Sequence, residues 1–356
     1  MEKQPQEKGL SDIRWVPLDG AWEAEGSDEL VFMGGEYDPP PAPVIAGKPE
    51  KQDGEPQKFI NFGTLLFDQN FKEGHLRMQV EFDDVDHRSS AAMVIQYDPA
   101  TKDMLTFGIS GGGLKYAPGV SGFLYRLRQW AAPTDQQQQG TSTAITTPKV
   151  WTSLFEVGFG VNLKAKRAYD LGVSVRGSVV TLFIDGVEIG KHTLAIPSLP
   201  GNPCGIFCGS HRNIHVRNIS VKAATPTAFI VMQFQPPEYE ALFKDVIEPV
   251  CKAEGLQAYR ADSTYMPGLV IEDIKRQIAE CRVVIAEITP GNPNVYYEVG
   301  YADALNKPLI LIADRREGLK PFDVRAYRTI FYENSIGGKS AVEKDLRLYL
   351  RGILNK

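Results

Sequence analysis

The sequence predicts two domains of different fold class. We expect an all-β jelly-roll sandwich over residues 1–224 and a doubly wound α/β domain with a parallel sheet over residues 225–356. In the first part, apolar residues alternate in short runs broken by Gly, Pro and Asp, which is the period of half-buried strands. In the second part, apolar strands alternate with amphipathic helices. The segment KAATPT (222–227), a short Ala/Thr/Pro connector, separates the two patterns.

Strand patterns in the first part are separated by turn signals every 8–12 residues, which is typical of a β-sandwich. The clearest strands are expected within residues 74–85, 90–99, 169–194 and 214–221. Asp185-Gly186 separates VTLFI from VEIGK and predicts a two-residue hairpin, because a type I′ turn needs two residues that tolerate positive φ. The proline-rich residues 37–56 and the polar residues 133–148 are expected to be surface loops.

The second part predicts a regular alternation of strands and helices. Strands are expected at 228–234, 256–262, 282–289 and 308–314, and helices at 238–255, 269–281, 292–306 and 341–354. The first strand, AFIVMQF, is almost entirely apolar, as in a strand buried on both faces. Gly255 is expected just beyond the end of the first helix. This alternation predicts a flavodoxin-like sheet.

Composition narrows the class of protein. The 356 residues include 39 Lys and Arg against 44 Asp and Glu, a net charge of -5, whereas a dedicated nucleic-acid-binding protein normally carries a basic surplus. No apolar stretch approaches the ~18–20 residues of a membrane span, and the N-terminal MEKQPQEKGLSDIRW lacks the apolar core of a signal peptide. Four cysteines do not make a disulfide framework. We therefore expect a soluble cytoplasmic protein that binds neither nucleic acid nor membrane.

A candidate site lies at the carboxyl ends of the predicted parallel strands, where open α/β sheets bind ligands. Polar or aromatic side chains follow three of these strands: Gln233 and Phe234 after the first, Asp262 and Ser263 after the second, and residues 289–301 after the third. In the third segment, Asn292 is a good N-cap and Pro293 suits the first helical position, so a helix is expected to begin there.

This helix has a defined orientation. At 100° per residue, its apolar side presents Val295, Val299 and Ala302 to the sheet, and an adjacent stripe carries Asn294, Glu298 and Tyr301. Glu298 is thus expected early in the helix, flanked by Tyr297 and Tyr301. A carboxylate at such a position costs desolvation free energy unless something uses it.

Three segments of the second part resemble a group of bacterial TIR-like domains: VMQF, VVIAEITPGNPNVYYEVGYADALNKPLILIA and PFDVRAYRTIFY. These domains are closely allied to the nucleoside 2-deoxyribosyltransferase-like fold. The resemblance runs from Thr227 to the end, and NPNVYYEVGYA is its specific part. It implies cleavage of an N-glycosidic bond to ribose by one essential Glu, which Glu298 matches. Asp323 and Arg325 match a late PFD motif and are expected to close the pocket, and Glu287 stands where the family more often has Asp.

The chemistry of such a reaction calls for a carboxylate. A ribose–base bond breaks through an oxocarbenium-like state, which a carboxylate stabilises or traps. In NAD the leaving group is already a cationic pyridinium, so no strong general acid is needed; a neutral nucleoside would need a second acid, for which Asp262 is the candidate. Phe234 or Tyr297 is expected to stack on the substrate, and backbone N–H groups of residues 292–295 to hold a pyrophosphate.

The resemblance therefore implies an NAD glycohydrolase that releases nicotinamide and uses NAD as a substrate, with no cofactor and no metal. It further implies a bacterial immune-type effector that self-associates, with a glycan, protein or small-molecule trigger at the sandwich. Three alternatives stay open: a nucleoside 2-deoxyribosyltransferase, a nucleotide- or glycan-binding module without turnover, and a glycan hydrolase centred on the first domain.

The first domain resembles concanavalin-like or laminin-G-like sandwiches through YDLGVSV…GSVVTLFIDGV and GIF…IHVRNISV. Such domains bind glycans or proteins, or hydrolyse polysaccharides. Glu81, Asp83 and Asp86 follow E-x-D-x-x-D, close to the E-x-D-x-x-E strand motif of laminarinase-like enzymes, although Asp84 to Asp86 also fits an exposed turn.

One further pattern, C-x3-C-x2-H-x3-H, comprises Cys204, Cys208, His211 and His215 and suggests zinc. Its central spacing is far shorter than in a zinc finger. On strands, Cys208 fits an inward-facing small hydrophobe and His215 an outward-facing residue beside Arg217. We therefore predict no metal.

Overall fold

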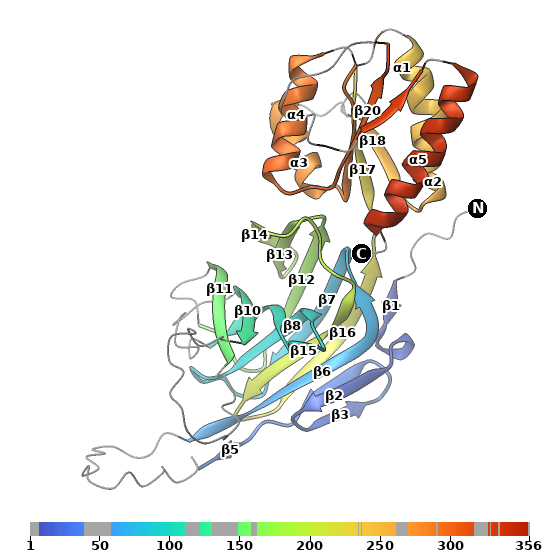
Figure 1. Cartoon of the computed structure of the whole chain (residues 1–356). Coiled ribbons are helices and arrows are strands. Elements are labelled where there is room, and N and C mark those ends of the chain that lie inside the picture. Colours follow the sequence, from blue (N-terminus) through green and yellow to red (C-terminus); the bar gives the residue numbers. More distant parts are fainter. Residues whose placement is uncertain are drawn as a thin grey trace, which may run out of the picture.

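The computed structural model describes residues 7–38, 58–111, 122–129, 149–157, 162–233, 235, 237–260, 270–289, 291–316, 327, 329–333 and 335–354. Its first part is an antiparallel β-sandwich and its second part an α/β domain with a parallel sheet (Figure 1). The last strand of the sandwich ends at Ala223 and the first strand of the parallel sheet begins at Thr227. The division predicted at residue 224 falls between these two strands.

Two eight-stranded sheets form the sandwich. One has the order β14-β13-β12-β7-β16-β4-β3, with β1 also pairing with β16; the other has the order β11-β10-β9-β8-β15-β6-β2, with β5 also pairing with β6. The strands are β1 (Lys8–Gly9), β2 (Trp15–Asp19), β3 (Trp22–Glu25), β4 (Glu29–Phe32), β5 (Glu36–Tyr37), β6 (Phe59–Phe71), β7 (Gly74–Phe82), β8 (Ser90–Tyr97), β9 (Met104–Ser110), β10 (Gly122–Gln129), β11 (Lys149–Val157), β12 (Ala168–Arg176), β13 (Val179–Ile184), β14 (Val187–Thr193), β15 (Asn202–Ser210) and β16 (Ile214–Ala223). Because consecutive strands such as β6 and β7, or β15 and β16, lie in different sheets, the sandwich is of the jelly-roll type.

The core of the sandwich follows from the alternation in the sequence. In β7 every second residue, from Gly74 through Met78 to Phe82, is buried. The predicted hairpin is confirmed, because Asp185 and Gly186 have φ of 51° and 77° between the paired strands β13 and β14. The predicted strand over residues 74–85 is three residues too long, since β7 ends at Phe82 and a bend follows.

The α/β domain has a five-stranded parallel sheet in the order β18-β17-β19-β20-β21, the 2-1-3-4-5 order of doubly wound sheets. Its strands are β17 (Thr227–Val231), β18 (Gln257–Arg260), β19 (Val283–Glu287), β20 (Leu309–Asp314) and β21 (Thr329–Tyr332). Its helices are α1 (Pro237–Leu242), α2 (Glu248–Ala253), α3 (Val270–Glu280), α4 (Pro293–Ala304) and α5 (Ile336–Leu354). α1, α2 and α5 cover one face of the sheet, and α3 and α4 cover the other (Figure 1).

Three details differ from the predicted elements. The expected helix over 238–255 contains a π-helical turn, Phe243–Ile247, between α1 and α2. Pro249 follows this turn, and a proline has no N–H to complete the regular ladder. The short strand β21 was not predicted, and α5 begins at Ile336, five residues before the predicted start, and includes Gly337 and Gly338. The end of the first helix is as predicted, with Gly255 at φ 77°.

Buried polar contacts join the two domains. The Lys307 ammonium, 4% exposed, donates to the carbonyls of Ala279 (2.5 Å) and Cys281 (2.9 Å) in its own domain and of Pro197 (3.1 Å) in the sandwich. Ser178 of the sandwich donates its hydroxyl to the same Ala279 carbonyl (3.0 Å). Gly177 has φ 52°, and a Cβ there would lie 2.7 Å from the Glu280 carbonyl oxygen, so glycine permits this close approach.

An ion pair closes the same junction. Arg282, which precedes β19, lies 3.3 Å from Glu73 of the sandwich, and their side chains are 7% and 4% exposed. Burial raises the pKa of Glu73, and Arg282 offsets part of that rise. Removing either partner would leave a buried charge without compensation. Within the described residues, no helix is long and apolar enough to cross a membrane.

Candidate active site

The candidate site lies at the carboxyl edge of the parallel sheet. In the 2-1-3-4-5 order the connections change face between β17 and β19, and ligands bind in the crevice at such a switch point. The chain leaves β19 at Glu287 and enters α4 at Pro293. Asn292 is the N-cap, as predicted, and its side-chain oxygen accepts the N–H of Asn294 at 2.9 Å. That N–H is therefore already occupied and does not offer itself to a pyrophosphate.

α4 has the predicted orientation. Val295, Val299 and Ala302 are buried against the sheet. Glu298, in the second turn of the helix, is half-buried beside them. With a rise of about 1.5 Å per residue, it lies about 9 Å along the axis from the Asn292 cap. The carboxyl group therefore faces the flank of α4 and not the end of the helix.

The Glu298 carboxyl group has a strongly raised pKa. Burial raises its pKa from 4.5 to about 7. Among the residues that the structure describes, no side chain forms a hydrogen bond or ion pair with it, so nothing there offsets the desolvation. A carboxyl group with this pKa is half-ionised near neutral pH, and a cation brought by a ligand would favour its ionised form.

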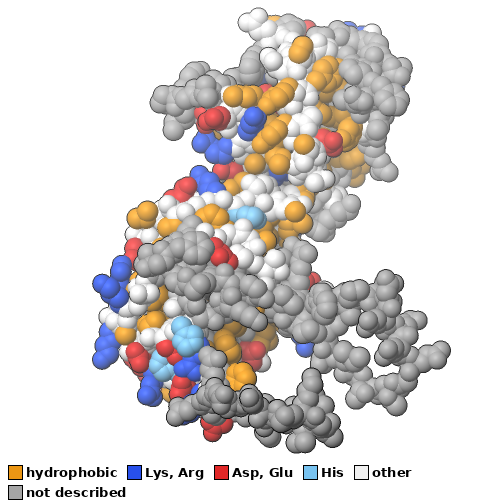
Figure 2. All heavy atoms as spheres, turned by 90° about the vertical axis from the view of Figure 1, so that its left-hand side faces the viewer, with side chains coloured by type: hydrophobic (Ala, Val, Ile, Leu, Met, Phe, Trp, Pro, Cys, Tyr) orange, Lys and Arg blue, Asp and Glu red, His pale blue; other side chains and the backbone are white. Residues whose placement is uncertain are grey.

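Aromatic side chains flank Glu298. Tyr297 is 47% exposed and offers a ring to solvent. Tyr301 is half-buried, and the Lys275 ammonium of α3 lies 5.7 Å from its ring centre. Figure 2 shows apolar side chains gathered on this face of the α/β domain, where Ile271 of α3 is also exposed. A planar base can stack on such a surface.

A second carboxyl group at this edge is in a different state. Glu287, 1% exposed, ends β19; it accepts the Thr289 N–H (3.0 Å) and the Tyr332 hydroxyl (3.4 Å). These hydrogen bonds hold the ends of β19 and β21 together, a role of Glu287 that sequence reasoning missed because Tyr332 lies 45 residues away. The nearby Tyr296 hydroxyl is buried and lacks a partner among the described residues, and burial together with the Glu287 charge raises the pKa of Tyr296.

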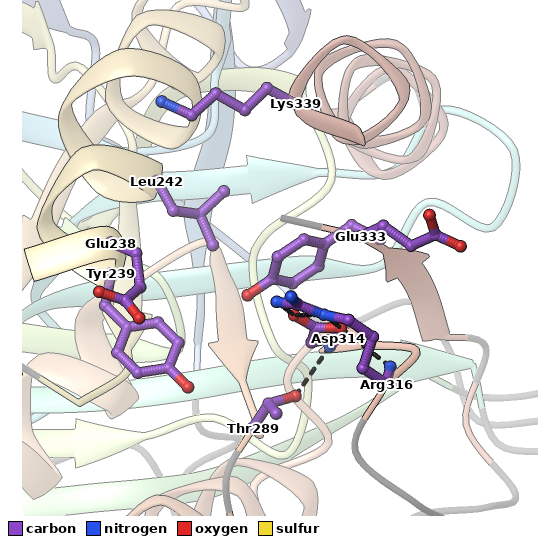
Figure 3. Close-up of a pocket in the computed structure, with 9 residues that line it drawn as sticks. Glu238, Tyr239, Leu242, Thr289, Asp314, Arg316, Glu333 and Lys339 are labelled. Atoms are coloured by element: carbon purple, nitrogen blue, oxygen red, sulfur yellow. Dashed lines mark hydrogen bonds and ion pairs between the residues drawn. The ribbon is translucent and has the colours of Figure 1, made fainter. Parts of the chain in front are cut away.

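A cavity of about 90 Å³ opens at the same edge, on the side covered by α1 and α5 (Figure 3). Thr289 lies at its base and accepts the Asp314 N–H at 2.8 Å. Its two cations are already paired: Arg316 with Asp314 at 2.5 Å, and Lys339 with Asp245 at 2.9 Å. The cavity has room for a few water molecules or one small ion. Glu298 is not among its described lining residues.

The remaining predicted site residues divide into two groups. Phe234, Asp262, Ser263, Asp323 and Arg325 lie outside the described residues. Gln233 is half-buried just beyond β17. At the far end of α4, the Tyr327 hydroxyl donates to Asp303, and this hydrogen bond raises the pKa of Tyr327 to about 12. Of the predicted set, Asn294, Tyr297, Glu298 and Tyr301 lie on α4, and Asn292 is its N-cap.

In the sandwich, the zinc pattern does not form a site. Cys204 and Cys208 are fully buried in the core between the sheets. His215 instead faces outward, with its Nδ1 2.7 Å from Glu29, which Arg217 also contacts at 2.8 Å. Glu25, Glu29 and His215 do offer ligand atoms within 4.8 Å of one another, but the Arg217 charge already compensates Glu29. The expected inward Cys208 and outward His215 are confirmed.

The laminarinase-like motif is also interrupted. Only Glu81 lies on β7, because the strand ends at Phe82. Glu81 lies 3.4 Å from Arg217, Asp83 lies 3.5 Å from His215, and Asp86 lies 2.5 Å from Arg88. Asp86 lies beyond β7 and is half-buried, so the exposed turn that was the other interpretation holds for Asp83 and Asp84 at most. Each carboxylate has a basic neighbour, so the group lacks an unpaired acid for glycoside hydrolysis.

No family model matches this chain, and no curated protein matches it. Solved structures do. A carbohydrate-binding module from Bacillus subtilis is 9% identical, covers 60% of this chain and 98% of its own, and has a TM-score of 0.37. A β-1,3-1,4-glucanase (lichenase) derived from a mouse hindgut metagenome is 9% identical over 62% of this chain and 99% of its own, with a TM-score of 0.37.

A third similar structure is a CMP N-glycosidase from Clostridium botulinum. It is 19% identical, covers 34% of this chain and 98% of its own, and has a TM-score of 0.29. None of the three is named as a TIR domain or as an enzyme that acts on NAD. With all three TM-scores below 0.5, these likenesses carry no argument about activity, and any functional assignment depends on the residues themselves.

Proposed function

We propose that the α/β domain cleaves the N-glycosidic bond of NAD. The bonding electron pair leaves with nicotinamide, and the ribosyl carbon is taken either by water, which gives ADP-ribose, or by the adenine ring of the same molecule, which gives cyclic ADP-ribose. The observation that carries this proposal is Glu298: a desolvated carboxyl group with a pKa of about 7 and no partner among the described residues, at the flank of α4. Such a group is costly to the folded chain unless a ligand supplies positive charge. The ribosyl cation that develops during N-glycosidic cleavage supplies it.

The protonation state of Glu298 distinguishes two versions of this chemistry. With NAD the leaving group is a cation, so the reaction requires the ionised carboxylate, which stabilises the ribosyl cation while the bonding electron pair leaves with nicotinamide. With a neutral base, as in CMP, the base must receive a proton, and a protonated Glu298 can donate it. The first version loses activity below pH 7 and the second loses it above pH 7.

The resemblance to TIR-like domains, which rests on the run NPNVYYEVGYA around Glu298, supports the choice of NAD. The exposed ring of Tyr297 also supports it, because a planar base can stack there. In this proposal the concanavalin- or laminin-G-like sandwich senses a trigger and the chain acts as a self-associating bacterial immune-type effector. Specific activity should then rise with protein concentration.

The direct test is to incubate the full chain with NAD and follow nicotinamide release against pH. Catalytic efficiency should rise about tenfold per pH unit below pH 7 and level off above it. Glu298→Gln should abolish release, and Glu272→Gln, an exposed carboxyl on the neighbouring α3, should not change it. Activity that survives Glu298→Gln would refute the proposal.

The alternative is a nucleoside 2-deoxyribosyltransferase, which would exchange bases between deoxynucleosides and ignore NAD. Glu298, which has no partner among the described residues, fits it equally well, because a nucleophilic carboxylate can trap the deoxyribosyl group. Incubating the chain with a deoxynucleoside and a second free base separates the two: base exchange without nicotinamide release would assign the transferase.

A further inference from the structure

Part of the C-terminal cap of α3 comes from the sandwich. The last carbonyls of an α-helix have no partner within the helix. In α3 the Ala279 carbonyl accepts the backbone N–H of Ser178 at 3.3 Å and the Ser178 hydroxyl at 3.0 Å. Ser178 belongs to the turn between β12 and β13, at the end of the sandwich that faces the α/β domain (Figure 1). A turn of one domain thus satisfies the helix end of the other.

This turn fits closely against the end of α3. Gly177 has φ 52°, a left-handed conformation that glycine adopts without strain. A Cβ at this position would lie 2.7 Å from the carbonyl oxygens of Glu280 and Cys281. Ser178, which follows it, is 1% exposed. A side chain at position 177 would therefore push the turn and the helix apart.

Lys307 joins the same helix end to α4 and to a second point of the sandwich. Its backbone N–H donates to the Ala302 carbonyl of α4 at 3.0 Å, and its ammonium donates to the carbonyls of Ala279 and Cys281 at 2.5 and 2.9 Å. The same ammonium donates to the Pro197 carbonyl of the sandwich at 3.1 Å. A cation at this place also interacts favourably with the negative end of the α3 dipole. The two helices and the sandwich therefore meet at one buried ammonium group.

α3 lies beside the part of α4 that carries Glu298. Ile278 of α3 shares one hydrophobic core with Val299 of α4. Glu298 and Tyr301, three residues apart, lie on the same side of α4, and the Lys275 ammonium of α3 is 5.7 Å from the Tyr301 ring centre. A displacement of α3 would therefore change the surroundings of Glu298.

We propose that the sandwich regulates the site on α4 through α3. Docking of the turn between β12 and β13 completes the end of α3 and holds this helix against α4, and undocking releases the helix end and opens the surroundings of Glu298. The effect of docking on activity rests on the proposed function, whereas its effect on α3 does not. A change in the sandwich that moves this turn would thus alter activity without touching the substrate.

Two glycines in neighbouring turns offer matched variants. Gly177→Ala places a methyl group against α3. Gly186, in the turn between β13 and β14, has φ 77°, and a Cβ there meets no described atom within 4 Å beyond its chain neighbours. Gly186→Ala therefore introduces similar backbone strain without contact with α3. Ser178→Ala removes only the hydroxyl donor, and it serves as the milder variant if Gly177→Ala does not fold.

The first measurement is hydrogen exchange of the full chain, followed by mass spectrometry. In Gly177→Ala the amides of residues 274–281 should exchange about tenfold faster than in wild type, because the helix end loses its partners. Ser178→Ala should accelerate them about fivefold, as expected for the loss of one neutral hydrogen bond. Exchange in α5, on the opposite face of the sheet, should stay unchanged in all variants, and Gly186→Ala should match wild type in α3. Unchanged exchange of residues 274–281 in both Gly177→Ala and Ser178→Ala would overturn the proposal, as would an equal rise in Gly186→Ala.

The second measurement is nicotinamide release by the same variants at equal protein concentration. Gly177→Ala should be about tenfold slower than Gly186→Ala at an unchanged helix content, because Glu298 is no longer held in place. The midpoint of its pH profile should also move below the wild-type value of about 7, because water reaches the carboxyl group. Equal release and equal midpoints in the two glycine variants would overturn the regulatory role. Absence of release from wild type would instead refute the proposed function, and hydrogen exchange would still decide whether the sandwich holds α3.

Discussion

Glu298→Gln should stabilise the folded chain, and only at high pH. The pKa of Glu298 is raised from 4.5 to about 7 by burial, and each pH unit corresponds to about 1.4 kcal/mol. The ionised carboxylate therefore lowers the free energy of unfolding by at most about 3.5 kcal/mol, and the partial exposure of the side chain reduces this to about 2 kcal/mol. Glutamine keeps the shape and carries no charge, so it removes the penalty.

The sign follows from proton linkage. Below pH 4.5 the carboxyl group is neutral in both states and the penalty is absent. Between pH 4.5 and 7 the unfolded chain loses the proton first, so stability falls as the pH rises, and above pH 7 the penalty is complete. Glu298→Gln should thus match wild type at pH 4 and exceed it by about 2 kcal/mol at pH 8.

Urea denaturation can resolve this difference by domain. All four tryptophans, at positions 15, 22, 130 and 151, precede the α/β domain, and the described α-helices lie within that domain. Tryptophan fluorescence therefore reports the sandwich, and circular dichroism at the helix band reports the α/β domain. The matched control is Glu254→Gln: hydrogen bonds from Arg351 lower the Glu254 pKa, so this change should destabilise at pH 8. A Glu298→Gln effect of the same size at pH 4 and pH 8 would refute the burial argument.

Three further changes test the junction and the cap. Lys307→Met should lower the free energy of unfolding by about 3 kcal/mol in urea denaturation, because it leaves buried carbonyls without a donor; an unchanged midpoint would contradict this. Glu73→Gln should cost about 3 kcal/mol by stranding the Arg282 charge, and the double change of Glu73 and Arg282 to Met should recover most of it; additive losses in that cycle would refute the pairing. Asn292→Ala should lower stability by about 1 kcal/mol through loss of the N-cap bond, with nicotinamide release reduced but not abolished; complete loss of release would show that Asn292 does more than cap the helix.

Local patterns in the sequence predicted the elements whose conformation depends on neighbouring residues. Asp185-Gly186 formed the expected turn, and Val295 and Val299 faced the sheet, because both outcomes follow from turn chemistry or helical period. The strand Thr329–Tyr332 was not predicted, because four residues are too few to show a period. It forms because it pairs with β20. The π-helical turn before Pro249 likewise depends on how the chain packs, which period alone does not show.

The candidate site divides in the same way. Residue type and position on α4 made Glu298 a candidate, but its pKa depends on burial by the whole domain. The contact of Lys307 with Pro197 joins residues 110 apart, and Glu73 with Arg282 joins two domains. Neither contact can be predicted from the sequence, because lysine and glutamate are usually exposed and are buried only where the fold brings a partner to them.

Glu287 and Glu298 illustrate two roles of a buried carboxyl group at this edge, one in stability and one in the proposed reaction. Both carboxyl groups are withdrawn from water, yet Glu287 accepts hydrogen bonds from Thr289 and Tyr332, whereas Glu298 has no described partner. A satisfied buried carboxylate stabilises the edge, and substituting it should impair folding. An unsatisfied one destabilises the chain, and substituting it should improve stability while removing activity. Glu298→Gln should therefore raise the free energy of unfolding and abolish nicotinamide release. A residue whose replacement has both effects is kept for the reaction and not for stability.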